Sequence, residues 1–318
     1  KDINLRMKAK AVGMVAQDYL TDRVEETKVE IAQREVQFVE NPPEEFLQEL
    51  LAGQNNTADW HAGCKSQPSA NQLFKFKCAS RGNEIACARY DADIDKILLV
   101  RKREACGIKP RNDEQKFALD ACLNRKIPLV SLTGGAGTGK TLLALASALE
   151  QERDFDQIIL SRPTVVLGNQ DIGFLPGDQK NKMSPFLQPL MDNLNVIKAQ
   201  FRPSSREWQH IEALIKEEKL LITPLAYIRG RSLGKAFFII DEAQNLTHEI
   251  KTIITRAGDG TKMVFTGDIF QIDQPYLDQW SNGLTHLGEK MSGQKLFEHV
   301  FLKKGERSEL SEIAAKLL

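Results

Sequence analysis

The chain has 318 residues, enough for one large domain and a smaller one. Its 42% apolar and 27% charged residues are typical of a soluble globular protein, and no apolar run approaches the roughly 18–20 residues that cross a bilayer. The five cysteines are odd in number and never spaced as Cys-x-x-Cys, which argues against a disulfide framework or zinc ribbon and favours a reducing cytoplasm.

The net charge is zero but unevenly distributed along the chain. Residues 1–59 carry 7 basic and 12 acidic side chains, residues 60–111 carry 11 basic and 5 acidic, and the remainder is close to neutral. The basic stretch indicates either a polyanionic partner or simply a solvated basic face, and both interpretations stay open. The residues that we expect to contact nucleic acid in the first case are Lys75, Lys77, Arg101, Lys102 and Arg103.

The chain divides into three expected blocks. Residues 1–24 begin without an initiator Met or an apolar signal core, which is typical of a piece cut from a longer protein. Residues 25–106 contain period-2 segments and turn residues, which predict a small antiparallel β module. Its expected strands are 74–78, 85–90 and 97–100, with a short helix at 43–52.

The third block, residues 107–318, alternates short apolar strands with helical stretches. That alternation predicts an α/β fold with a mainly parallel sheet and helices on both faces. The expected strands are 129–133, 158–161, 220–223, 236–240, 263–266 and 300–302.

The first strand of this block leads into a glycine-rich loop that matches G-x-x-x-x-G-K-[ST]. Its residues are Gly134, Gly135, Ala136, Gly137, Thr138, Gly139, Lys140 and Thr141. A helix-forming run follows, so backbone N–H groups and the helix N-terminus would surround a phosphate. We expect Lys140 to reach the β- and γ-phosphates of ATP and the Thr141 hydroxyl to bind Mg²⁺.

The strand 236–240 ends in an acidic pair, Asp241 and Glu242. Ligands of open α/β sheets bind at the carboxyl ends of the strands, so both side chains are expected at the nucleotide. Asp241 would hold Mg²⁺, and Glu242 would orient and deprotonate the attacking water.

A third strand ends in Gly267-Asp268, and Gln271 follows three residues later. An amide at this place would hydrogen-bond the γ-phosphate or the attacking water. The alternative is an ordinary turn after a strand.

In this order, Gly-Lys-Thr, Asp-Glu-Ala-Gln and Gly-Asp-x-x-Gln resemble the first RecA-like domain of superfamily 1 helicases. The wider pattern is closer still to the PhoH-like ATPases, over residues 107–318. The further segments that carry this resemblance are 110–115, 172–178, 227–231 and 305–308. The resemblance implies a RecA-like P-loop NTPase that hydrolyses MgATP and binds single-stranded RNA, with remodelling or unwinding as its output.

The resemblance also implies roles for single residues. Gln115 would read the adenine edge, Arg162 would lie where helicases touch the nucleic-acid backbone, and Arg307 would neutralise charge on the transferring phosphoryl group. Residues 1–24 resemble the end of a PIN nuclease domain, with Asp2 as one of its metal-binding acids.

The same resemblance implies a homo-oligomer, in the form of a hexameric ring. Only 11 residues follow Arg307, so we expect one RecA-like surface per chain and a neighbouring copy as the second wall of the nucleotide site. Arg229 and Arg231 are alternative candidates for an arginine that acts on the neighbour.

Two rival functions stay open at this point. A P-loop small-molecule kinase would share the glycine-rich loop but should lack the Gly-Asp-x-x-Gln segment. A nucleotide-gated switch would bind nucleic acid or protein without unwinding.

Overall fold

The computed structural model describes most of the chain in nine segments, with only the backbone for residues 78, 84 and 179–185. These are residues 8–9, 11–14, 36–52, 57–78, 84–163, 179–228, 233–247, 249–274 and 277–306. The expected PIN-like remnant at 1–24, Asp2 included, therefore lies largely outside the described residues. No helix of the described part is long and apolar enough to cross a membrane.

The small N-terminal module is a five-stranded sheet in the order β1-β3-β4-β5-β2. Its strands are β1 (Gln37–Glu40), β2 (Thr57–Ala58), β3 (Leu73–Cys78), β4 (Glu84–Asp91) and β5 (Lys96–Leu99), and its helices are α3 (Glu44–Ala52) and α4 (Trp60–Gly63). The three expected strands and the expected helix are present. However, β1 pairs with β3 in parallel, so the sheet is mixed rather than wholly antiparallel.

The core of the small module follows from alternation along β3. Phe74 and Phe76 are fully buried, whereas the lysines between and after them are partly exposed. Phe46 of α3 packs on Phe76 with ring centroids 4.9 Å apart. The helix thus covers the apolar face of the sheet and closes a separate small core.

The large sheet has six parallel strands in the order β11-β6-β10-β9-β7-β8. They are β6 (Leu129–Gly134), β7 (Gln157–Arg162), β8 (Leu220–Pro224), β9 (Ala236–Ile240), β10 (Lys262–Gly267) and β11 (Phe297–Leu302). The parallel sheet expected from the sequence is confirmed, and each of its six strands overlaps the expected range.

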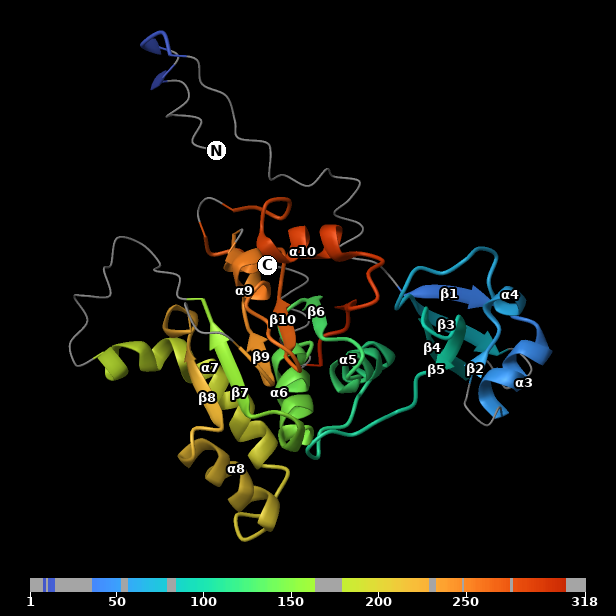
Figure 1. Cartoon of the computed structure of the whole chain (residues 1–318), viewed down its shortest axis with the longest axis horizontal. Coiled ribbons are helices and arrows are strands. Elements are labelled where there is room, and N and C mark those ends of the chain that lie inside the picture. The colour runs from blue at the N-terminus through green and yellow to red at the C-terminus, as the bar shows by residue number, and fades with distance from the viewer. Residues whose placement is uncertain are drawn as a thin grey trace.

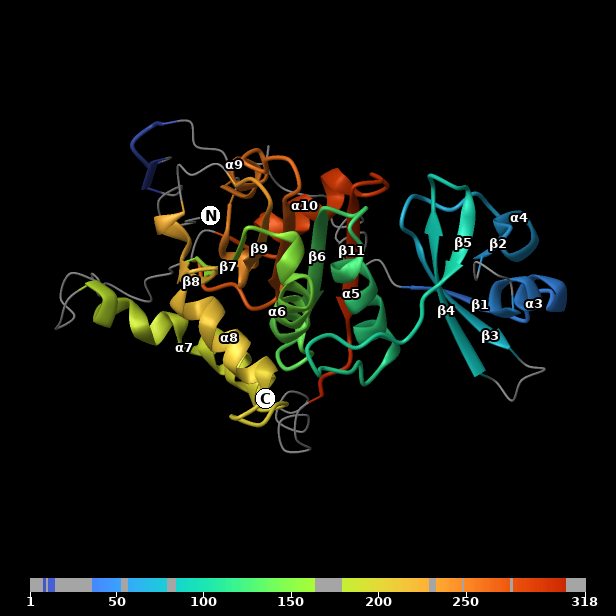
Figure 2. The same cartoon turned by 60° about the horizontal axis from the view of Figure 1, so that its bottom comes forward.

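Helices cover both faces of the large sheet (Figures 1 and 2). One core contains residues of α5 (Asp113–Leu123), α6 (Lys140–Glu150), α7 (Gln179–Lys198) and α8 (Arg206–Lys216). The opposite core contains residues of α9 (Glu249–Ile254) and α10 (Gly283–Met291). Successive residues of β9 enter opposite cores, which explains why this strand is apolar throughout.

The small module packs beside the large sheet, at the right of Figure 1. The contact contains four charged side chains, which we call the interface charge cluster: Arg89, Asp120, Lys262 and Glu298. The Arg89 Nε atom lies 3.3 Å from Asp120 Oδ2 and 3.8 Å from Glu298 Oε2. Burial raises the pKa of Glu298 to about 8, so this carboxyl group is largely protonated at pH 7.

Lys262 completes the cluster beneath α5. Its Nζ atom donates to three backbone carbonyls at the end of that helix and just beyond it, those of Ala121 (2.9 Å), Asn124 (2.8 Å) and Ile127 (2.7 Å). Burial lowers the pKa of this ammonium group to about 8. The three carbonyls replace the water that a lysine would otherwise keep.

Candidate active site

The glycine-rich loop joins β6 to α6, and its shape depends on particular glycines. Gly137 and Gly139 have φ of 78° and 90°, the left-handed region that favours glycine. A Cβ atom on Gly134 would lie 2.1 Å from the carbonyl oxygen of Leu302 on β11. Gly134 is therefore needed for close strand packing, whereas Gly135 has open space around it.

The loop closes around the side chain of Lys140, the first residue of α6. Its Nζ atom lies 2.6 Å from the carbonyl oxygen of Gly134 and 2.8 Å from that of Gly135. The buried Thr138 hydroxyl donates to the Gly135 carbonyl at 2.9 Å. The expected phosphate-binding lysine is thus inside the arch of the loop, at the N-terminus of an 11-residue helix.

Hard oxygen ligands meet beside the loop. The Thr141 hydroxyl donates to Asp241 Oδ1 at 2.6 Å, and the buried Thr266 hydroxyl donates to the same oxygen at 2.7 Å. The described residues contain no cluster of three or more His, Cys, Asp or Glu side chains suited to a metal. One hydroxyl and one carboxylate fit Mg²⁺, which keeps waters and phosphate oxygens as its remaining ligands.

Glu242 lies beyond the end of β9 in a strained conformation, with φ of 51° and ψ of 40°. Arg162 Nη2, from the end of β7, lies 2.8 Å from Glu242 Oε1. Burial raises the pKa of Glu242 most, and the nearby Asp241 charge raises it further. The hydrogen bond from Gln244 and the charges of Arg162 and Lys140 lower it. A carboxylate with a raised pKa suits a base that works near neutral pH.

Gln244 is a site residue to which the sequence analysis gave no role. Its side chain is fully buried. The Nε2 atom donates to Glu242 Oε2 at 2.5 Å and to the Gln271 carbonyl at 2.8 Å. The Oε1 atom accepts from the backbone N–H of Asp268 at 3.1 Å. A Cβ atom on Gly267 would approach Gln244 Oε1 to 2.1 Å. The sequence feature that could have identified Gln244 as a site residue is its place at the end of the Asp-Glu-Ala-Gln motif.

A cavity of about 270 Å³ brings most of the expected site residues together. Gln271 lines it with an exposed side chain. The other expected residues on its wall are Ala136, Gly137, Gly139, Lys140, Thr141, Asp241 and Glu242, accompanied by Arg162, Asp268 and two residues of α7.

A second cavity, of about 770 Å³, adjoins the first through Gly137, Gly139 and Leu142. Gln115 lines it and holds the loop, since its Nε2 donates to the Thr138 carbonyl at 3.0 Å and its Oε1 accepts from Arg111 N at 2.9 Å. An amide can make one further bond on each side. Adenine recognition by Gln115 therefore stays a prediction.

Several expected residues lie outside the described part of the chain. These are Arg229, Arg231, Arg307 and the segment 172–178. The residue before Arg307 is described: the backbone N–H of Glu306 donates to the Gly137 carbonyl at 3.0 Å, and its carboxylate accepts from Asn112 Nδ2 at 2.8 Å. The chain therefore reaches the phosphate loop at residue 306.

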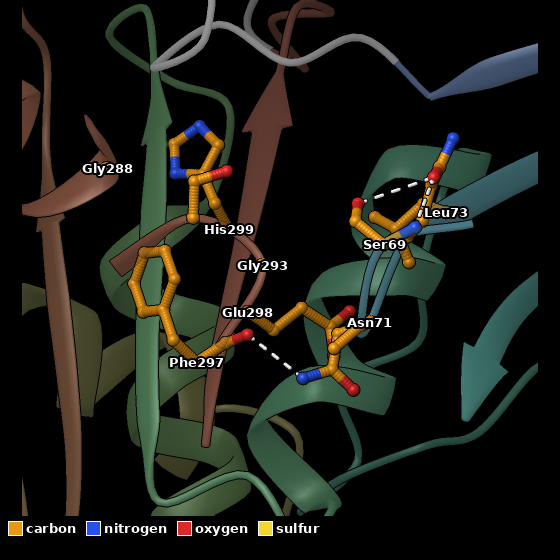
Figure 3. A pocket seen from close by; sticks show the side chains of 11 residues that line it. Ser69, Asn71, Leu73, Gly288, Gly293, Phe297, Glu298 and His299 are labelled. Atoms are coloured by element: carbon orange, nitrogen blue, oxygen red, sulfur yellow. Dashed lines mark hydrogen bonds between the residues drawn. The ribbon is translucent and has the colours of Figure 1, made fainter. Parts of the chain in front are cut away.

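A further cavity, of about 250 Å³, lies where the small module meets β11, and it shares no lining residue with the first (Figure 3). Asn71 donates to the carbonyls of Lys295 and Phe297, both at 2.9 Å. Glu298 extends from β11 toward Asn71, and neither of its carboxyl oxygens has a hydrogen-bond partner among the described residues. This cavity belongs to the packing between the sheets.

Comparison with known proteins gives a consistent picture. A family model described as "PhoH-like protein" matches residues 107–317. "Protein PhoH2" of Bacillus subtilis is 38% identical over 327 residues, which cover 100% of this chain and 71% of that protein. "Protein PhoH2" of Mycolicibacterium smegmatis is 32% identical, covering 100% and 69%.

A solved structure titled "Crystal structure of Pif1 helicase from Candida albicans" matches 66% of this chain and 43% of that chain. The identity is 15% and the TM-score is 0.34, a likeness too low to bear on function.

Proposed function

The chain belongs to the PhoH-like protein family, as its motifs led us to expect, and on that premise we propose that it is a Mg²⁺-dependent ATP hydrolase coupled to single-stranded RNA. One observation carries the proposal: Lys140, Thr141, Asp241, Glu242 and Gln271 line the same cavity at the carboxyl edge of the parallel sheet. A phosphate cradle and a carboxylate positioned for water are the two requirements of hydrolysis by a P-loop protein.

In the proposed reaction, the loop N–H groups and Lys140 hold the β- and γ-phosphates of ATP. Glu242 accepts a proton from a water molecule as the oxygen of that water bonds to the γ-phosphorus. The bond between the γ-phosphorus and the bridging oxygen breaks, and the bridging oxygen leaves as part of ADP. Gln271, whose exposed side chain lines the same cavity, donates a hydrogen bond to the γ-phosphate or to the attacking water. Thr141 and Asp241 hold Mg²⁺, which supplies charge neutralisation on the phosphates when bound.

Coupling to RNA is proposed from charges outside the cavity. Arg101, Lys102 and Arg103 are exposed, in the segment that leads from the small module to the large sheet. Lys75, by contrast, is 19% exposed and its Nζ lies 3.5 Å from Asp113, so it belongs to the contact between the modules. Lys77, whose Nζ lies 3.8 Å from Glu40, is more exposed and stays a candidate. The proposed RNA contacts are thus Lys77, the three residues of the connecting segment and Arg162, which lines the cavity.

The proposal is testable by measuring phosphate release from MgATP with single-stranded RNA, with single-stranded DNA and without nucleic acid. Release without any phosphate acceptor, faster with RNA, supports it. No release until a small-molecule acceptor is added would favour a kinase. Slow release that nucleic acid does not change, with nucleotide-dependent RNA affinity, would favour a switch.

We further propose that the protein acts as a homo-oligomer, in a hexameric ring, in which a neighbouring copy closes the nucleotide cavity. Head-to-tail contacts of this kind close into rings when the rotation allows. Light scattering gives the mass, and a mixture of Lys140→Ala and Arg307→Ala proteins tests the contact. Activity in the mixture that neither variant has alone places Arg307 on the neighbour, whereas a fully active monomer rules the ring out.

A further inference from the structure

Glu242, the proposed base, is held on both carboxylate oxygens. Arg162 Nη2 lies 2.8 Å from Oε1, and Gln244 Nε2 lies 2.5 Å from Oε2. The two donors differ in mobility. Gln244 is buried and has further bonds to Gln271 and Asp268, whereas the Arg162 side chain is 24% exposed. Arg162 is therefore the partner that can leave.

This contact opposes catalysis by Glu242. A general base must offer a lone pair to the attacking water, and an Arg–carboxylate bond occupies that oxygen with a charge-assisted donor. The charged groups around Glu242 are Asp241 of its own strand end, Arg162 of β7, Lys140 of α6 and Asp268 after β10. Removing Arg162 leaves Glu242 Oε1 accessible to the attacking water.

The same guanidinium group suits a different anion. Arginine binds phosphate oxygens with bonds as strong as those it makes to carboxylates, often in bidentate geometry. Arg162 ends β7 at the carboxyl edge of the sheet and reaches Glu242 from the neighbouring strand. A phosphodiester group arriving at this edge would compete with Glu242 for one cation, and the guanidinium group would have an anionic partner before and after the exchange.

We propose that Arg162 is a positioning residue that restrains Glu242 in the RNA-free protein, and that a phosphodiester group of single-stranded RNA releases Glu242 by binding Arg162. The inference rests on the proposed function, because it explains how RNA would stimulate hydrolysis. It also makes a claim that needs no turnover: Glu242 and RNA compete for Arg162, so removing the Glu242 charge should strengthen RNA binding through Arg162.

The experiment measures the affinity of a fluorescein-labelled single-stranded oligouridylate for four proteins without ATP: wild type, Glu242→Gln, Arg162→Ala and the double variant. We expect Glu242→Gln to bind about tenfold more tightly than wild type, within the usual range of coupling between sites. In the Arg162→Ala background the same substitution should have almost no effect. Equal effects in both backgrounds would overturn the proposal, because they would reflect overall charge alone.

Turnover supplies the second readout. Arg162→Ala should raise the RNA-free ATPase rate several-fold, bring the ratio of RNA-stimulated to RNA-free rate close to one, and leave KM for ATP unchanged. Arg162→Lys should keep part of the stimulation. Arg153→Ala, which removes an exposed arginine after α6, should behave as wild type.

The two proposals fail separately. A wild-type protein that releases no phosphate, yet shows the coupling in RNA affinity, retains the restraint and loses the ATPase assignment. An RNA-stimulated ATPase without the coupling loses the restraint alone. A lower RNA-free rate in Arg162→Ala would also overturn the restraint, since Arg162 would then assist Glu242.

Discussion

Two groups of charged side chains lie at opposite ends of the large sheet. Asp241 and Glu242 follow the carboxyl end of β9 and face a cavity, and the Glu242 side chain is 29% exposed. Lys262 and Glu298 lie at the amino ends of β10 and β11, where the Glu298 side chain is 1% exposed. Both groups contain acids and bases within hydrogen-bonding or ion-pair distance, and each borders a cavity, but the charged side chains at the carboxyl end are the more exposed.

The difference shows what separates a reactive cluster from a structural one. At the carboxyl end, the present partners of Lys140, Glu242 and Arg162 can be replaced by phosphate or water. At the amino end, Arg89 and Lys262 are enclosed by protein and nothing replaces what they touch. A perturbed pKa beside a cavity therefore does not by itself identify a functional site, and the exposure of the charged side chains has to be considered as well.

The largest effect is expected from Arg89→Met, which removes the cation of the interface charge cluster. Asp120 then stays buried without its partner, and breaking a buried pair costs about 3–5 kcal/mol of unfolding free energy. Urea denaturation measures it. Arg125→Met is the matched control, because it removes an exposed Arg–Asp pair and should cost less than about 1 kcal/mol. Similar losses in both variants would show that the cluster contributes little.

Glu242→Gln should lower ATP turnover at least about a hundredfold while ATP affinity changes little, because the base is lost and the phosphate cradle stays. Single-turnover phosphate release and equilibrium ATP binding separate the two quantities. Glu217→Gln, an exposed glutamate after α8, is the control. Turnover at the wild-type rate would remove Glu242 from the mechanism.

Lys140→Ala should weaken ATP binding about 10- to 100-fold, since a hydrogen bond to a charged group contributes about 1.5–3 kcal/mol. Calorimetric titration with MgATP measures it. The variant should unfold near the wild-type midpoint, because the loop carbonyls that the ammonium group contacts can turn to water. Unchanged affinity would contradict a phosphate role for this lysine.

The stability of the amino-end cluster should depend on pH through Glu298. Its pKa is about 8 in the folded protein against an ordinary value of 4.5, so the folded state holds the extra proton between these values. The contribution is fully present below pH 4.5 and is lost as pH rises to 8. Glu298→Gln does not titrate, so its stability relative to wild type should increase from pH 5 to 8 by several kcal/mol, at about 1.4 kcal/mol for each pH unit. A constant difference would show that Glu298 is ionised throughout.

The smallest effect concerns the connecting segment. Replacing Arg101, Lys102 and Arg103 together by Gln should weaken RNA binding a few-fold. The slope of log affinity against log salt concentration should become less steep by up to about 2, because each lost phosphate contact contributes roughly 0.7. Lys251→Gln, an exposed lysine of α9, is the control. An unchanged slope would identify the segment as a solvated surface.

The sequence predicted what depends on local pattern. Strand periodicity and the glycine-rich loop located all six strands of the large sheet and the Lys140 arch, because buried strands and tight loops restrict residue type. Strand β1 was missed, since three of its four side chains are exposed and carry no alternation. The Arg162–Glu242 bond was missed because it joins residues 80 positions apart through neighbouring strands. Lys75 was expected on an exposed strand face, and the sequence did not show that Asp113 of α5 lies beside it.

The enclosure of Lys262 has a chemical consequence. The pKa of about 8 belongs to the buried amine, and an acylating reagent can reach Lys262 only when water reaches it too. Its three carbonyl contacts at the end of α5 and just beyond it prevent that in the closed structure. The rate at which Lys262 is acylated therefore reports the population of molecules in which α5 and β10 have separated, and mass spectrometry of that one peptide measures it without any spectroscopic probe.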